Sequence, residues 1–190
     1  DTEEVVASSY PVLEPRLPRE ISFIHTQELE DRWPDLSIKD RELAAARELG
    51  AYFLIGIGGV LNSGIRHDNR AADYDDWSTI NEEGTMGLNG DIIVHDKTAD
   101  RALELSSMGI RVSADALEAQ LKEMGLEEKK ELEFQRGVLN GTFPLAIGGG
   151  IGQSRLCLLL LHKYHLGEVQ ASVWPHETIE RYKKLGVPFL

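Results

Sequence analysis

Short apolar runs and longer periodic stretches of apolar and polar residues follow one another along the 190 residues of the chain. Runs rich in β-branched and aromatic residues, bounded by turn-forming residues, predict β-strands. Such runs lie at residues 21–24, 51–57 and 169–174, near Asp91, near Glu104, and in a glycine-rich stretch that begins at Ile147. We expect these runs to supply the strands of the fold.

Helical periodicity and capping residues mark the stretches between the predicted strands. Ser37 precedes residues 38–49 and Gly50 follows them, in the positions of an N-cap and a C-terminal glycine. After Ser113, apolar positions 117, 121 and 124 share one helix face, and Gly125 ends that helix. Further helices are expected at residues 26–33, at 127–139, in an apolar stretch that runs to His165, and just after Pro175.

Strands and helices are mixed without a regular alternation. This order favours an α+β fold over a doubly wound parallel sheet. The first 18 residues are polar and contain three prolines, which is typical of a connecting segment. We therefore predict a linker or loop over residues 1–20 and one domain over residues 21–190.

Composition narrows the possible partners. With 42% hydrophobic and 27% charged residues, the chain is long enough and apolar enough for one domain with its own core. A net charge of −12 argues against a nucleic-acid partner, which would require a basic surface. No apolar run approaches membrane-spanning length. The lone Cys157 is expected to be buried and inert, and a single cysteine fits a reducing, cytoplasmic location.

The glycine-rich stretch at residues 147–152 is the most informative motif, and Arg155 follows it at the opening of an apolar helix. Glycines leave a flat strand surface on which a planar ligand can lie close to the backbone. An arginine one turn later can cover that ligand or contact phosphate oxygens. The motif is neither a Walker loop nor a Rossmann fingerprint. It indicates an adenine nucleotide site, or alternatively a close-packed corner with Arg155 as a surface cation.

Two carboxylates lie on the neighbouring predicted strands. A hairpin would bring Asp91 and Glu104 to the same region. Paired carboxylates beside a triphosphate suit Mg²⁺, which takes oxygen ligands and bridges to phosphates. The alternative is that both are solvated hairpin charges.

A strongly charged stretch, residues 66–78, follows the apolar strand at residues 51–57. Charge directly after a buried strand predicts a loop at the end of that strand, where open sheets carry their chemistry. An amino-acid substrate needs a carboxylate for its ammonium group and an arginine for its carboxylate. A hydrated acidic loop is the alternative, but Tyr74 and Trp77 argue against it.

Four blocks of the chain, in this order, resemble the ammonia-dependent asparagine synthetases of the A type, the aspartate–ammonia ligases. The blocks are Asp73-Tyr74-Asp75-Asp76-Trp77-Ser78, Gly87-Leu88-Asn89-Gly90-Asp91-Ile92, Glu104-Leu105-Ser106-Ser107-Met108-Gly109-Ile110-Arg111, and residues 147–156. The resemblance runs from residue 25 to residue 175 and corresponds to the C-terminal part of that family. It implies a catalytic fold like that of class II aminoacyl-tRNA synthetases, a mixed, largely antiparallel sheet flanked by helices.

The resemblance also implies roles for particular residues. Asp75 and Arg155 would carry the reaction. Aspartate binding would fall to Asp75, Ser107, Gly152 and Arg70. Nucleotide binding would fall to Arg155, Glu104, Gly149, Gly150, Ser106 and Met108, and metal binding to Asp91 and Glu104.

The implied reaction is ATP-dependent synthesis of asparagine from aspartate and ammonia, with Mg²⁺, through a β-aspartyl-AMP intermediate that releases AMP and pyrophosphate. Complete members of the family begin with an N-terminal region that nothing here matches. We therefore expect this chain to be incomplete on its own, and the assembled protein to be a homodimer that includes the missing N-terminal segment. Two alternatives stay open: the catalytic domain of an asparaginyl- or aspartyl-tRNA synthetase, and a non-catalytic synthetase-like remnant.

Overall fold

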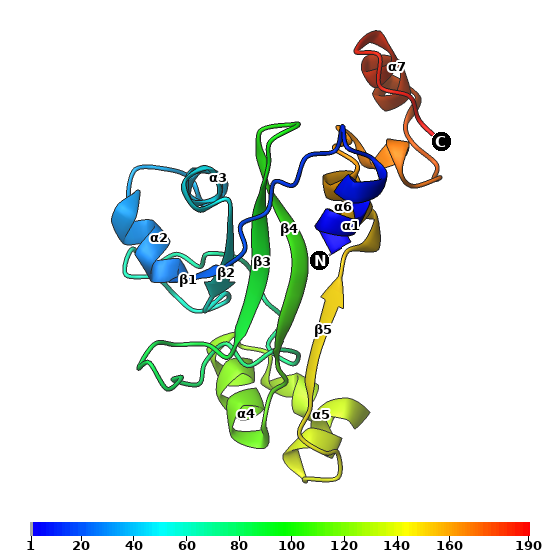
Figure 1. Ribbon diagram of the computed structural model, residues 1–190. Helices are drawn as coiled ribbons and strands as arrows, with labels where there is room; N and C mark the ends of the chain where they lie inside the picture. The colour runs from blue at the N-terminus through cyan, green and yellow to red at the C-terminus, as the bar shows by residue number, and fades with distance from the viewer. Residues whose placement is uncertain (1) are drawn as a thin grey trace.

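The computed structural model describes residues 2–190 and contains a five-stranded sheet in the order β1-β2-β3-β4-β5 (Figure 1). The strands are β1 (Ser22–His25), β2 (Ala51–Ile55), β3 (Asn89–Asp96), β4 (Arg101–Ile110) and β5 (Ile147–Ile151). β1 pairs with β2 in parallel, and every other neighbouring pair is antiparallel. The predicted α+β class with a largely antiparallel sheet is confirmed.

Seven α-helices and two short 3₁₀ helices accompany the sheet in the part of the chain that the structure describes. The α-helices are α1 (Thr2–Ser9), α2 (Thr26–Arg32), α3 (Ile38–Leu49), α4 (Ala114–Glu123), α5 (Glu133–Leu139), α6 (Gln153–Leu160) and α7 (His176–Lys184), and the 3₁₀ helices are η1 (Glu127–Glu131) and η2 (Leu166–Glu168). The predicted caps are present, because the Ser37 side chain accepts a hydrogen bond from the Asp40 N–H and Ser113 does the same for Ala116. Gly50 ends α3 with a φ of 75°, a conformation that favours glycine.

Several local predictions differ from the structure. Helix α1 occupies part of the segment expected to be a linker or loop. The single helix predicted at residues 127–139 is divided at Leu132, whose extended backbone separates η1 from α5. The apolar helix ends at Leu160 rather than at His165, and Cys157 is exposed rather than buried.

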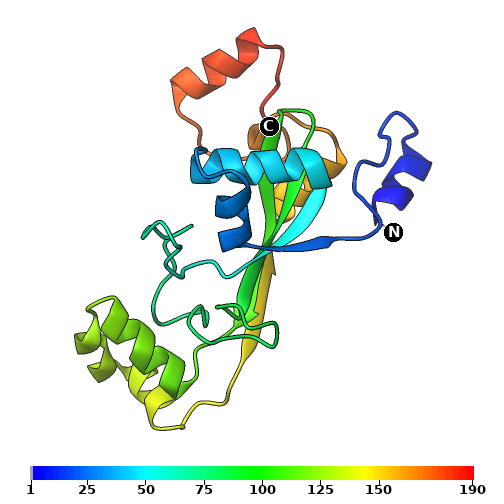
Figure 2. The same cartoon turned by 90° about the vertical axis from the view of Figure 1, so that its left-hand side faces the viewer.

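The strand predicted at residues 169–174 is also wrong. These residues form no strand, and Val173 is 98% exposed. The segment leads out to α7, beyond one end of the sheet, while α4 and α5 lie at the other end (Figures 1 and 2). An apolar run becomes a strand only when a neighbouring strand satisfies its backbone groups, and none does so here.

Three apolar clusters hold the helices in place. Helices α2 and α3 pack on the sheet through Leu29, Ala45 and Ala46, against Tyr52 and Leu54 of β2. Helix α6 packs on the sheet through Leu159 in a second cluster. In the third cluster, α4 packs on the charged loop, and its buried members are Ala72, Val112, Ala116, Leu117 and Leu121. The loop at residues 66–78 therefore lies between the end of the sheet and α4.

Part of one sheet face remains apolar and exposed. Phe23, Phe53 and Ile92 are successive partners in the strand register, and Ile151 follows beyond Ser106. Phe23 and Ile151 are 66% and 64% exposed. Ile147 at the start of the edge strand β5 is 79% exposed. The functional groups described next lie mainly on the opposite face, because successive side chains along a strand point to opposite sides.

Candidate active site

Asp75 lies at the centre of the charged loop and is 2% exposed. The loop forms an isolated bridge between Asp75 and Arg111, directly beyond the end of β4. In this position the Asp75 carboxylate makes an ion pair with the Arg111 guanidinium. A second guanidinium, that of Arg70, lies 3.9 Å from the other carboxylate oxygen. The positive charges of two guanidinium groups therefore lie against this buried carboxylate.

Arg70 connects the charged loop to the sheet. Its Nη2 donates to Asp91 Oδ2 at 2.5 Å, and its Nη1 donates to Ser107 Oγ at 3.0 Å. Asp91 and Ser107 are direct partners in the register of β3 and β4, so their side chains lie on the same face. Three residues predicted to bind aspartate (Arg70, Asp75 and Ser107) are therefore brought together with the predicted metal ligand Asp91.

Arg111 and Tyr74 also belong to this group, although the sequence predicts no role for either of them. Besides its ion pair with Asp75, Arg111 donates to Tyr74 Oη at 3.0 Å, and its guanidinium carbon lies 3.9 Å from the centre of the Tyr74 ring. One signal was present in the sequence. Arg111 follows Ser107 by four residues, and even spacing along a strand places side chains on one face.

The predicted nucleotide side adjoins this group. Arg155, in the first turn of α6, donates through Nη1 to the Glu104 backbone oxygen at 2.9 Å and lies 3.2 Å from Glu104 Oε1. Both side chains remain accessible, at 42% and 44%. A cavity of about 450 Å³ joins the two sides, and it is lined by Tyr74, Asp75, Glu104, Leu105, Ser107, Arg111, Gly149, Gly150, Gly152 and Arg155.

The glycines of β5 have different surroundings. A Cβ atom on Gly148 would lie 2.4 Å from Arg111 Nη2, so this glycine makes room for the arginine that holds Asp75. A Cβ atom on Gly150 would meet nothing within 4 Å. Gly150 therefore leaves an open surface on the cavity floor beside Arg155. The packing of the protein does not require a glycine at this position.

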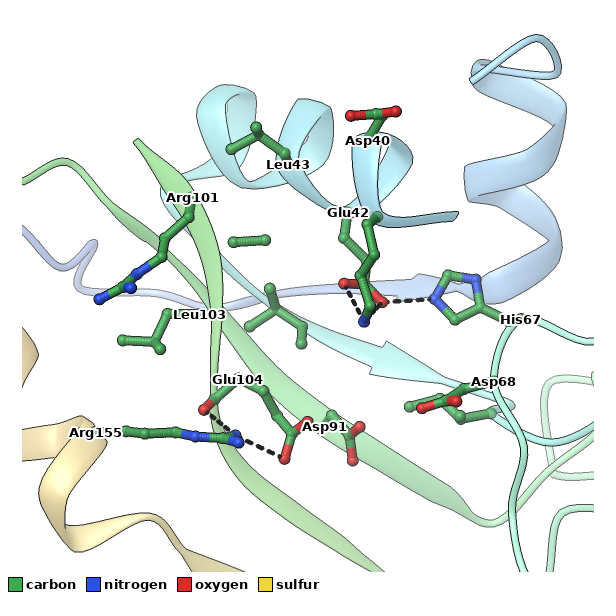
Figure 3. A pocket seen from close by; sticks show the side chains of 14 residues that line it. Asp40, Glu42, Leu43, His67, Asp68, Asp91, Arg101, Leu103, Glu104 and Arg155 are labelled. Atoms are coloured by element: carbon green, nitrogen blue, oxygen red, sulfur yellow. Dashed lines mark hydrogen bonds and ion pairs between the residues drawn. The ribbon is translucent and has the colours of Figure 1, made fainter. Parts of the chain in front are cut away.

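Asp91 and Glu104 also share a second cavity, of about 430 Å³, in which Arg155 lies beside Glu104 (Figure 3). Asp91 Oδ1 is buried and has no hydrogen-bond partner among the residues that the structure describes, so it is available to a further ligand. Within residues 2–190, no group of three or more histidine, cysteine or acidic side chains is placed to hold a metal ion. Two carboxylates fit a Mg²⁺ ion that takes its other ligands from phosphates and water.

His67 lines the same cavity, but its contacts give it a structural role. It is 2% exposed, and its Nε2 lies 3.0 Å from Glu42 Oε1 of α3 (Figure 3). Burial raises the pKa of Glu42, but hydrogen bonds from His67 and Lys39 outweigh it and leave the pKa below its usual range. A charged Glu42 thus secures His67, which in turn ties the charged loop to α3.

Two residues predicted to bind nucleotide do not present their side chains to the cavity. Ser106 is 3% exposed, and its hydroxyl donates to the Gly150 backbone oxygen at 3.0 Å. The Met108 side chain lines a shallow apolar pocket that also contains Phe53 and Ile147. The alternation along β4 accounts for this difference, because Ser107 faces the site while its neighbours Ser106 and Met108 face away.

Comparison with known proteins establishes the family to which the chain belongs. The family model described as aspartate-ammonia ligase matches residues 1–186. The chain belongs to this family. An aspartate–ammonia ligase of Parabacteroides distasonis is 50% identical over 186 residues, which are 98% of this chain and 54% of that protein. The chain therefore spans about half the length of this relative.

Solved structures with a similar fold are class II aminoacyl-tRNA synthetases. The aspartyl-tRNA synthetase of Entamoeba histolytica matches with a TM-score of 0.57 and 17% identity, over 90% of this chain and 34% of that one. The asparaginyl-tRNA synthetase of the same organism, in complex with asparaginyl-adenylate, matches with a TM-score of 0.56 and 16% identity, over 88% and 37%. At these identities the likeness establishes the class II synthetase-like fold. No helix within residues 2–190 has the length and apolar character needed to cross a membrane.

Proposed function

We propose that the protein to which this chain contributes synthesises asparagine from aspartate, ammonia and ATP through β-aspartyl-AMP. The observation that carries this proposal is the single cavity that joins the buried Asp75–Arg111 pair to the glycine floor beside Arg155. One side of this cavity carries the charged groups that an amino acid requires, and the other carries the flat glycine surface and the arginine that a nucleotide requires. Membership of the aspartate–ammonia ligase family supports the same reaction.

The charges around Asp75 complement those of aspartate. The substrate carries one ammonium group and two carboxylates, whereas this part of the site carries one buried carboxylate and the guanidinium groups of Arg70 and Arg111. Asp75 would bind the ammonium group, and a guanidinium would bind a carboxylate in bidentate form. The side-chain carboxylate of aspartate would then point along the cavity towards the floor at Gly150.

The nucleotide would lie on the β5 floor with Arg155 against its ring or its phosphates. In this structure the Arg155 guanidinium is paired with Glu104. Because both side chains are partly exposed, replacing this ion pair with a contact to phosphate costs little free energy. Asp91 and Glu104 would hold Mg²⁺, which when bound neutralises phosphate charge. Gly150 leaves open the close approach to the backbone that a planar base requires, whereas Gly152 would contribute to the binding of aspartate.

In this arrangement the reaction proceeds in two displacements. A side-chain carboxylate oxygen of aspartate forms a bond to the α-phosphorus of ATP, and the bond to pyrophosphate breaks. The nitrogen of ammonia then attacks the acyl carbon of β-aspartyl-AMP, AMP leaves with the electrons of the acyl–oxygen bond, and the nitrogen releases one proton as the amide forms. The residues of this chain align the two substrates and neutralise charge, and these effects account for most of the catalysis of such reactions.

The same proposal includes the assembly of the complete protein. The apolar face around Phe23, Ile147 and Ile151 is exposed, and β1 and β5 are the edges of the sheet. Exposed apolar faces and free strand edges favour association with a complementary segment. We propose that the additional residues found in the full-length relative cover this face, that the assembled protein is a homodimer, and that it works in the cytoplasm.

An assay of the complete protein tests the reaction. ¹⁵N-ammonium, aspartate and ATP should give ¹⁵N-labelled asparagine with equal amounts of AMP and pyrophosphate. Glutamate should be a poor substrate, since one additional methylene displaces the reacting carboxylate and a misplacement of about 1 Å costs about a hundredfold. Formation of ADP would contradict the adenylate, and aminoacylation of tRNA without free asparagine would favour the synthetase alternative. Binding of ATP and aspartate without any turnover would favour the non-catalytic remnant.

A further inference from the structure

Gln120 is a fully buried polar residue near the end of α4, and the hydrogen bonds of its side chain go to the charged loop. Its Nε2 donates to the backbone oxygens of Ala72 and Asp75, at 3.0 and 3.1 Å. Its Oε1 accepts from the Trp77 backbone N–H at 2.9 Å and from the Ser78 hydroxyl at 3.0 Å. The exposed fraction of the residue is 0%.

These four contacts use the whole capacity of the amide. A glutamine offers two N–H groups and one oxygen with two lone pairs, and each finds a partner here. The partners lie on both sides of Asp75 along the chain, at positions 72, 75, 77 and 78. No other residue type has a side chain of this length with two donors and two acceptor lone pairs. Only glutamine can therefore make all four hydrogen bonds to the loop.

The backbone around Asp75 is also held from the opposite side. The Asp76 N–H donates to the Ile110 oxygen at 2.9 Å, and the Val112 N–H donates to the Tyr74 oxygen at 3.1 Å. The Asp75 carboxylate faces Arg111 between these two sets of bonds. The direction of a side chain follows from the position of its backbone, so the Gln120 contacts help to set where this carboxylate lies.

We propose that Gln120 is a positioning residue, which acts through the backbone of the charged loop to align the Asp75 carboxylate with Arg111 and the substrate. The inference rests on the proposed role of Asp75 in binding aspartate. It concerns alignment, since Gln120 itself is not among the residues that line the cavity. Its loss should therefore affect the use of aspartate far more than the binding of ATP.

The test compares two substitutions in the complete protein. Gln120→Met keeps the length and removes all four hydrogen bonds. Gln120→Glu keeps the acceptors but replaces both donors, so a carboxylate oxygen faces the Ala72 and Asp75 carbonyls. For each variant we expect kcat/KM for aspartate to fall by about ten- to a hundredfold, while KM for ATP stays within about twofold.

Leu121→Ala is the matched control. Leu121 is the next residue of α4 and is also fully buried. It packs in the apolar cluster between α4 and the charged loop and has no polar group to bond to the loop. This variant should lower the melting temperature at least as much as Gln120→Met and leave both KM values unchanged. If Gln120→Met likewise lowers only the melting temperature, with normal kinetics in the folded fraction, the proposal is overturned.

Two further outcomes remain decisive. If neither Gln120 variant folds, the wild-type Gln120 side-chain amide is followed by NMR, where slow exchange with water and a shift on adding aspartate are expected. Rapid exchange, or no response to aspartate, would overturn the positioning role. If the wild-type protein makes no asparagine, the proposed function fails, and calorimetric aspartate binding by the same variants still decides whether Gln120 aligns Asp75.

Discussion

The two ends of the site cavity are built differently. At the aspartate end, Asp75 is 2% exposed and lies between two arginines, one of which is also bonded to Asp91 and Ser107. At the nucleotide end, Arg155 and Glu104 are both more than 40% exposed and bond chiefly to each other. The first end is therefore held rigidly by this chain alone, whereas the second can rearrange around a ligand.

This difference predicts where the effects of substitutions will appear. Groups in a buried, fully bonded network are pre-organised, and the removal of one partner leaves another charge without compensation. An exposed ion pair contributes about 0–1 kcal/mol to stability, so its loss is noticed mainly when a ligand binds. Substitutions at the aspartate end should therefore be more severe, and substitutions at the nucleotide end more specific.

Asp75→Asn should have the largest effect. Breaking a buried charge pair costs about 3–5 kcal/mol, which corresponds to more than about a hundredfold at about 1.4 kcal/mol per factor of ten. We expect asparagine synthesis by the complete protein to fall by at least this factor while ATP binding persists. Asp73→Asn is the control, because Asp73 contacts Lys129 and Gln135 away from the cavity. Near-normal synthesis at low aspartate in the Asp75 variant would make Asp75 a structural charge.

Arg155→Ala should have the second-largest effect, and this effect should be confined to the binding of ATP. The loss of a charge-assisted contact costs about 1.5–3 kcal/mol, so ATP should bind about ten- to a hundredfold more weakly by calorimetry. The affinity for aspartate and the melting temperature should hardly change. Arg47→Ala removes another exposed ion pair, with Asp100, and should leave both ligands unaffected. Unchanged ATP binding in the Arg155 variant would place the nucleotide elsewhere.

Two alanine substitutions in β5 compare the two ends directly. In Gly148→Ala the new Cβ collides with the Arg111 guanidinium, whereas in Gly150→Ala it enters open space. We expect the first to raise KM for aspartate and the second to raise KM for ATP, each by about tenfold or less, as for a small displacement of a bound group. Steady-state kinetics with each substrate varied in turn distinguishes these effects. The same change in both variants would mean that the two ends are not separate.

The smallest expected effect is a pH dependence that arises from His165, which lies outside both ends of the cavity. Burial, and then the charge of Arg101, lower the pKa of His165, and Glu168 opposes this shift in part. The neutral ring stacks on Phe189 at 4.7 Å and lies 5.0 Å from Trp174. Because the folded pKa is below that of an unfolded histidine, near 6.5, this stabilisation is complete above about pH 6.5. It is lost as the pH falls from there through the lower pKa of the folded state.

Trp174 fluorescence should therefore change as the pH falls below about 6.5, before the binding of aspartate or ATP does. His165→Asn should abolish this change and leave asparagine synthesis near normal. A change in fluorescence that survives in His165→Asn would assign the titration to another group, with His162 the first to examine, since burial also lowers its pKa.

Most of the sheet and the helix ends were predictable because local residues control them. Ser37, Gly50 and Ser113 cap the helices expected from their positions, since a cap depends on hydrogen bonds within one turn. The predictions were wrong where contacts with residues distant in the sequence determine the local structure. The apolar run at residues 169–174 has no strand beside it, and the helix predicted at 127–139 breaks at Leu132, where η1 and α5 pack separately around α4.

The sequence by itself determined the family, the α+β class, and the segments that carry the candidate chemistry. It did so because glycine spacing, charged blocks and strand-forming runs are properties of neighbouring residues. Only the tertiary structure decided that Arg111 holds Asp75, that Ser106 and Met108 face away from the cavity, and that Gln120 binds the loop across a separation of more than 40 residues. These contacts depend on strand register and helix packing, which form only when segments far apart in the chain fold together.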